Sequence, residues 1–121
     1  MENLTAKLND AARDLIEAIE GSLPKDLEVS YKNGEGNVYM RRLYQARAGR
    51  LPRAVADRYG NDRLVRGRVD SFVRLFERLL DGASESPQGE KLVDACLASE
   101  AGKIYLLLAQ AIGRIGAPAK A

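Results

Sequence analysis

Apolar residues recur every three or four positions along most of the chain, a spacing typical of amphipathic α-helices. The pattern is clear over 1–20, where acidic residues occupy the opposite face until Gly21 and Pro24 interrupt it. A second pattern follows a cap at Asn61 or Asp62 and contains Val65, Val69, Phe72, Val73, Phe76, Leu79 and Leu80. Both segments are predicted to be helices, and the second apolar stripe is predicted to lie in the core.

Two shorter helices are expected in the middle of the chain. The apolar positions of 38–48 fit a helix of about three turns, with Asn37 as a favourable N-cap and Gly49 as the terminating residue. Pro52 suits the first turn of a further helix, because the N–H that proline lacks would have no partner there. That helix is expected to end before Gly60.

The polar stretch 81–90 contains glycine, serine and proline, which indicates a linker. Beyond it, the apolar pattern over 91–115 predicts a long helix, with a break near Ser99 and Gly102 as an alternative. The segment 27–37 has alternating apolar residues before an Asn-Gly turn signal, so a strand entering a hairpin competes with an extended loop. The extended loop is the preferred interpretation.

Together these elements predict an all-α fold, a single-domain bundle of four or five helices over 1–116 with a disordered tail at 117–121. A length of 121 residues fits one domain. The most apolar run, 104–109, is much shorter than the roughly 20 residues that span a bilayer. The N-terminal segment lacks the basic-then-apolar order of a signal peptide, and one cysteine allows no intramolecular disulfide. A cytoplasmic location without membrane contact is therefore expected.

The composition argues against catalysis. Histidine is absent, which removes the commonest general acid–base and the commonest transition-metal ligand. Cys96 lies in the apolar pattern of the last helix, where a buried structural thiol is the ordinary interpretation. Gly102 and Lys103 are not followed by serine or threonine, so they do not form a phosphate-binding loop. We expect a protein that is not an enzyme and that binds no cofactor or metal.

Charge is distributed unevenly, although the net charge is only +2. Residues 1–30 hold seven acids and three bases, whereas residues 31–80 hold twelve bases and five acids. Within the basic part, 37–55 reads NVYMRRLYQARAGRLPRAV, and no acidic side chain occurs from Gly36 to Ala56. Pairing with neighbours in sequence therefore cannot neutralise these arginines.

Nucleic-acid binding is the first functional hypothesis. Arginine contacts phosphates through two parallel hydrogen bonds, and tyrosine rings stack on bases. The acidic first helix is expected on the opposite side of the molecule. The predicted binding residues are Arg41, Arg42, Arg47, Arg50, Arg53, Arg63, Arg68, Tyr39 and Tyr44.

The alternative hypothesis is a small adaptor or self-associating subunit. In this interpretation the arginines meet carboxylates of the acidic first helix, in the same chain or a neighbouring one, or carboxylates of another protein. The candidate carboxylates of the first helix are Asp10, Asp14, Glu17 and Glu20. The nearly continuous apolar sequence from Ile104 to Ile112 also favours a homo-oligomer or a hetero-complex, because one chain of this size has little to cover it with.

Overall fold

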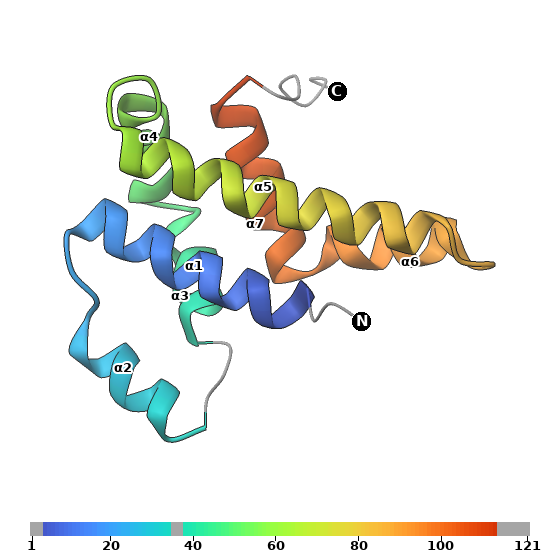
Figure 1. Cartoon of the computed structure of the whole chain (residues 1–121), viewed down its shortest axis with the longest axis horizontal. Coiled ribbons are helices and arrows are strands. Elements are labelled where there is room, and N and C mark those ends of the chain that lie inside the picture. The colour runs from blue at the N-terminus through green and yellow to red at the C-terminus, as the bar shows by residue number, and fades with distance from the viewer. Residues whose placement is uncertain (1–3, 35–37, 114–121) are drawn as a thin grey trace.

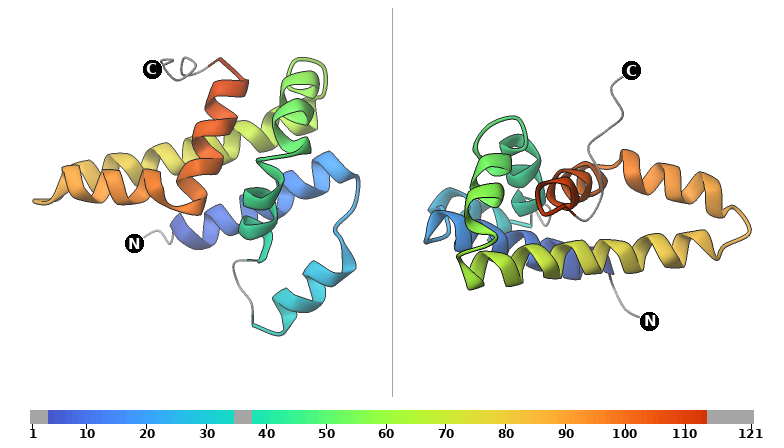
Figure 2. Two further views of the ribbon diagram at one scale, coloured as in Figure 1. Left: turned by 180° about the vertical axis from the view of Figure 1, so that it is seen from behind. Right: turned by 90° about the horizontal axis from the view of Figure 1, so that it is seen from above.

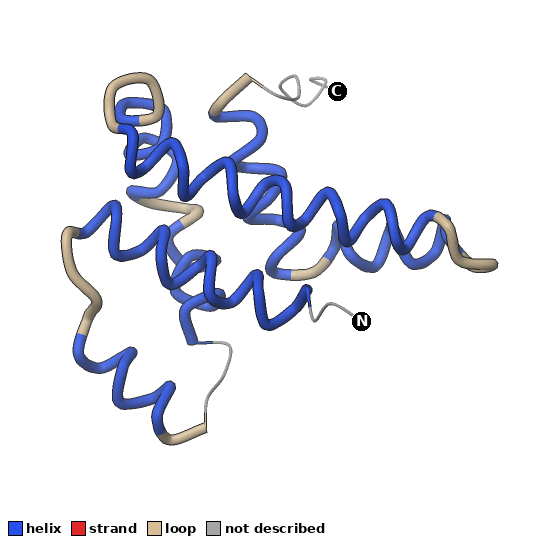
Figure 3. The backbone as a smooth tube through the Cα atoms, viewed as in Figure 1, coloured by secondary structure: helices blue, strands red, loops and turns tan. Residues whose placement is uncertain are grey.

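The structure, a computed structural model, describes residues 4–34 and 38–113, which form seven α-helices and no strand (Figures 1 and 3). The helices are α1 (Leu4–Glu20), α2 (Lys25–Lys32), α3 (Val38–Ala46), α4 (Arg50–Arg58), α5 (Arg63–Ser84), α6 (Gly89–Ala98) and α7 (Glu100–Ala111). The all-α class is confirmed, and the helix count exceeds the four or five expected. The tail at 117–121 lies outside the described residues. No helix in the described ranges is long and apolar enough to cross a bilayer.

The helices form two layers. Helices α1 and α5 lie side by side and run in opposite directions, and α3, α4 and α7 pack behind them (Figures 1 and 2). Helix α7 contacts α3, α4 and α5, so it joins the two layers. Helix α2 lies at one end beside α3, and the last turns of α5 project from the other end together with α6 (Figure 2).

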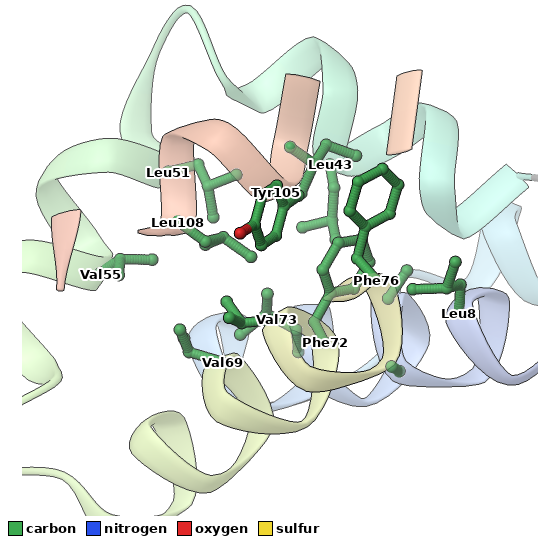
Figure 4. Close-up of a cluster of buried hydrophobic side chains, with 14 of the residues drawn as sticks. Leu8, Leu43, Leu51, Val55, Val69, Phe72, Val73, Phe76, Tyr105 and Leu108 are labelled. Atoms are coloured by element: carbon green, nitrogen blue, oxygen red, sulfur yellow. The ribbon is translucent and has the colours of Figure 1, made fainter. Parts of the chain in front are cut away.

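The core lies between these layers and consists of aliphatic and aromatic side chains, and no charged side chain among the described residues is buried. Helix α5 contributes Val65, Val69, Phe72, Val73 and Phe76, as its sequence pattern predicts, whereas Leu79 and Leu80 are only half-buried. The rings of Phe76 and Tyr105 stack with centroids 4.8 Å apart, which ties α5 to α7 (Figure 4).

The predicted cap at the start of α5 is confirmed for Asp62. One carboxylate oxygen of Asp62 accepts hydrogen bonds from the backbone N–H groups of Leu64, at 3.0 Å, and Val65, at 3.2 Å. These bonds satisfy two of the N–H groups that a helix start leaves without intrahelical partners.

The prediction for 27–37 is wrong in its first part, which forms α2 instead of a loop or strand. The alternating apolar residues do not mark a buried strand face, because Val29 is 57% exposed. Asp26 and Glu28 in the first turn of α2 favour the helix by interacting with its positive end. The proposed N-cap Asn37 lies outside the described residues.

The predicted linker at 81–90 is also shorter than expected, because α5 continues through Ser84 and α6 begins at Gly89. The hydroxyl of Ser84 donates to the carbonyl of Asp81 at 2.8 Å, inside the last turn of α5. A side chain at Gly89 would collide with the backbone of Ser84. The glycine therefore permits the close turn between two antiparallel helices.

The long helix predicted over 91–115 is broken at Ser99, the alternative that the sequence left open. The Ser99 hydroxyl accepts a hydrogen bond from the backbone N–H of Gly102 at 3.1 Å and caps α7. A Cβ atom at Gly102 would clash with the carbonyl oxygens of Cys96 and Leu97. The break thus depends on a cap and on the absence of a side chain three residues later.

Candidate anion-binding surface on α3 and α4

The arginine-rich stretch folds into α3, a tight turn and α4. The turn contains hydrogen bonds from the N–H of Arg47 to the carbonyl of Tyr44 and from the N–H of Gly49 to the carbonyl of Ala46. The apolar faces of the two helices are buried in the core through Tyr39, Met40, Leu43, Leu51 and Val55. The arginines between these positions are therefore directed to the outer faces or the edges of the helices.

Tyr39 does not belong to an external binding surface. Its side chain is 3% exposed, and its ring lies 5.4 Å from that of Tyr31 in a tilted arrangement. Burial raises the pKa of the Tyr39 hydroxyl, and the negative charge of Glu28 adds to the increase. Tyr39 is removed from the candidate site because a base cannot reach its ring.

The side chains of Tyr44 and Arg47 are in contact with each other. The Arg47 guanidinium donates to the Tyr44 hydroxyl at 2.7 Å and lies 4.0 Å from the centre of the tyrosine ring. The ammonium of Lys103 from α7 lies 5.7 Å from the same ring. The hydrogen bond from Arg47 is the main cause of a lowered pKa of the Tyr44 hydroxyl. Both residues are thus engaged within the protein.

Replacing Arg47 with methionine is expected to raise the pKa of the Tyr44 hydroxyl, because the phenolate loses its strongest hydrogen-bond donor. The measurement is an ultraviolet absorbance titration of tyrosine ionisation, with Tyr44→Phe in each background to identify the Tyr44 transition. An unchanged Tyr44 transition would show that Arg47 does not hold this hydroxyl.

Four arginines remain exposed on the two helices, and we refer to Arg41, Arg42, Arg50 and Arg53 as the α3–α4 arginine surface. The guanidinium of Arg42 lies 3.8 Å from the carboxylate of Glu20, and both side chains are more than two-fifths exposed, so this ion pair is weak. The other three arginines make no ion pair or hydrogen bond to the described part of the chain. They are available to an external anion.

The start of α4 strengthens the positive potential of this surface. Arg50 and Arg53 lie in its first turn, which contains no acidic residue, and Gly49 provides no side-chain cap. A helix N-terminus carries a partial positive charge on its free N–H groups. The positive charges of Arg50 and Arg53 repel this partial charge and also repel each other. A bound anion would relieve both repulsions.

A groove of about 810 Å³ adjoins the same surface, between α1, α3 and α4. Aliphatic side chains form its floor, and Arg42, Arg50, Glu20 and Gln45 are the exposed polar residues at its edge. The aliphatic lining residues are Ile16, Ile19, Leu43, Ala46, Leu51 and Ala54. Sequence reasoning missed this groove because it joins residues of α1 to residues more than 20 positions later.

Arg58 also lines the groove, but its guanidinium is already bound within the protein. It donates to the carbonyl oxygens of Ile19, at 2.8 Å, and Ala18, at 3.1 Å, and to the carboxylate of Asp62 at 2.8 Å. The last bond is the main cause of the lowered pKa of Asp62. Arg58 thus connects the C-terminus of α1 to the start of α5. The spacing of four residues between Arg58 and Asp62 is visible in the sequence, but the bonds from Arg58 to α1 are not.

The remaining predicted residues lie elsewhere. Arg63 and Arg68 are exposed on α5, which belongs to the other layer from α3, so the structure does not bring the whole predicted set together (Figure 2). The acidic helix α1 packs against α3 and places Glu20 beside Arg42, so the prediction that α1 lies on the opposite side is wrong at its C-terminal end.

Cys96 is half-buried and packs at the edge of the core, rather than inside it as predicted. Among residues 4–34 and 38–113, no three acidic or cysteine side chains gather in a way that could hold a metal ion. Comparison with protein-family models, curated proteins and solved structures gives no match to this chain.

Proposed function

We propose that this protein is a non-catalytic helical protein that binds the phosphate backbone of nucleic acids through the α3–α4 arginine surface. The observation that carries the proposal is the exposure of Arg41, Arg50 and Arg53 without a partner in the described chain. Several unpaired guanidinium groups on two consecutive helices raise the positive potential of that part of the surface and favour a polyanionic partner.

The start of α4 supports phosphate as the group that is recognised. Its free backbone N–H groups and the guanidinium groups of Arg50 and Arg53 are hydrogen-bond donors at the same helix end. Phosphate oxygens accept from both kinds of donor.

The same geometry predicts little preference for base sequence. Tyr39 is buried, and Tyr44 is covered by Arg47, so neither tyrosine offers a free ring for base stacking. Contacts to phosphates fix the position of a protein on nucleic acid but do not read the bases. Binding is therefore expected to depend on salt far more than on sequence.

Fluorescence anisotropy with labelled nucleic acids tests the proposal. At about 0.1 M salt, micromolar protein is expected to bind unrelated DNA and RNA sequences with similar affinity. Absence of binding to single- and double-stranded forms would refute the nucleic-acid function.

The groove favours a second candidate, an adaptor that binds an acidic amphipathic helix of another protein. Its aliphatic floor suits the apolar face of such a helix, and Arg42 and Arg50 suit the acidic flank. A synthetic helix of leucine and glutamate serves as the probe. Under this candidate Ala54→Trp, which fills the groove, abolishes peptide binding; if the variant binds the peptide as the parent does, the groove is not the docking site.

A further inference from the structure

The last turns of α5 and helix α6 form a hairpin that the helices other than α7 contact very little. Helix α6 packs mainly against α5 and α7, and it contains no buried residue. A helix of a globular protein normally buries one apolar stripe. This hairpin projects from the two-layered body, so the other described helices cover little of it (Figures 1 and 2).

Apolar side chains nevertheless line this hairpin. Leu92 is 42% exposed, and further aliphatic or thiol side chains are only half-buried. These partly covered residues are Leu79, Leu80, Val93, Cys96 and Leu97. A single exposed leucine requires no explanation, but a helix without a buried residue, a property that α6 shares with α2, leaves apolar surface that a partner could cover.

The expected oligomer surface around 104–112 is mostly occupied by the chain itself. Ile104, Tyr105, Leu108 and Ala109 are buried in the core, and only Leu106 reaches an exposure of 36% in this stretch. Exposed apolar side chains remain at Val29 and Tyr31 on α2, at Leu64 near the start of α5 and at Leu92 on the hairpin. Of these places, the hairpin is where two packed helices project together from the body (Figure 2).

Charge along α5 and along the tip of the hairpin indicates which partner fits. The part of α5 from Arg63 to Arg78 carries five arginines and two acids, whereas the tip from Asp81 to Asp94 carries four acids and one lysine. If a second copy packs with its hairpin antiparallel to the first, the acidic tip of each copy lies beside the basic part of α5 of the other copy. This is the reciprocal arrangement of an isologous two-fold interface.

We propose that two copies of this chain associate through their α5–α6 hairpins, packed antiparallel into a four-helix bundle. Leu92 and its half-buried neighbours form the apolar centre, and the oppositely charged parts of the hairpins set the direction. This assembly does not depend on nucleic-acid binding. It would, however, place two α3–α4 arginine surfaces on one particle and so increase the avidity for a polyanion.

Sedimentation equilibrium of the full chain tests the dimer. The expected mass is twice the 13.2 kDa of one chain. Leu92→Glu is expected to raise the dimer dissociation constant by about a hundred-fold or more, because the central contact is lost twice. Val29→Glu is the matched control, since Val29 is also exposed but lies on α2, and this variant is expected to remain dimeric with unchanged circular dichroism.

Charge reversal tests the direction of packing. Arg74→Glu and Glu85→Arg are each expected to weaken the dimer, and the double variant is expected to regain affinity, because each new glutamate meets a new arginine of the other copy. A monomeric mass at every concentration overturns the proposal. So does a dimer that Val29→Glu disrupts and Leu92→Glu does not, and so does a double variant weaker than both single variants.

Discussion

Replacing Phe76 with alanine is expected to lower the free energy of unfolding by about 3–5 kcal/mol. The Phe76 side chain has no exposed surface and stacks on Tyr105 at 4.8 Å between ring centroids. Its removal leaves a cavity at the contact between α5 and α7 that neighbouring helices cannot fill without moving. Urea denaturation followed by circular dichroism measures the loss.

Leu92→Ala is the matched comparison, because Leu92 is large and apolar but 42% exposed in the single chain. Measured at concentrations where the protein is monomeric, this change is expected to cost less than about 1 kcal/mol. A loss below half a kilocalorie per mole for Phe76→Ala would contradict the buried position of Phe76 between α5 and α7.

The core of α5 illustrates what the sequence reveals. Val65, Val69 and Phe72 recur at helical spacing after Asp62, and this pattern is enough to predict a capped helix with a buried stripe. Local periodicity and capping are properties of neighbouring residues, so they can be recognised without knowledge of the fold.

Contacts between distant segments could not be predicted in the same way. The sequence does not predict helix α2, because its few apolar residues fit a strand or a helix equally well. One of them, Val29, is exposed in the structure. The position of the break at Ser99 depends on the close approach of the backbone at Gly102 to the carbonyls of α6. Such an approach is a property of the folded chain.

For the candidate site as well, the sequence predicts one part and only the folded structure shows the other. Sequence identified the arginines of 37–55, but it could not tell a free arginine from an engaged one. Arg47 covers the ring of Tyr44, whereas Arg41 makes no ion pair or hydrogen bond in the described chain. That distinction arises from side-chain geometry and reduces the candidate set to four exposed arginines.

Replacing Arg41, Arg50 and Arg53 together with glutamine is expected to weaken nucleic-acid binding several hundred-fold at about 0.1 M salt. Each phosphate contact contributes nearly one power of ten at that salt concentration through counterion release, so three contacts contribute nearly three. The fold is expected to survive, because all three side chains are exposed. Anisotropy measures the affinity, and circular dichroism checks the fold.

A control with the same change in net charge separates local contacts from overall attraction. Lys25, Lys32 and Lys91 are exposed on α2 and α6, and their joint replacement with glutamine also removes three positive charges. This variant is expected to lose much less affinity. Equal losses in the two variants would mean that only the net charge matters and that α3 and α4 form no specific surface.

The salt dependence of binding tests the central proposal most directly, because its slope counts the phosphates that the protein contacts. For duplex DNA, the plot of log affinity against log salt is expected to become shallower by about 2.7 when Arg41, Arg50 and Arg53 are replaced, and to keep its slope in the lysine control. An unchanged slope in the arginine variant would contradict the assignment of these three residues to the phosphate backbone.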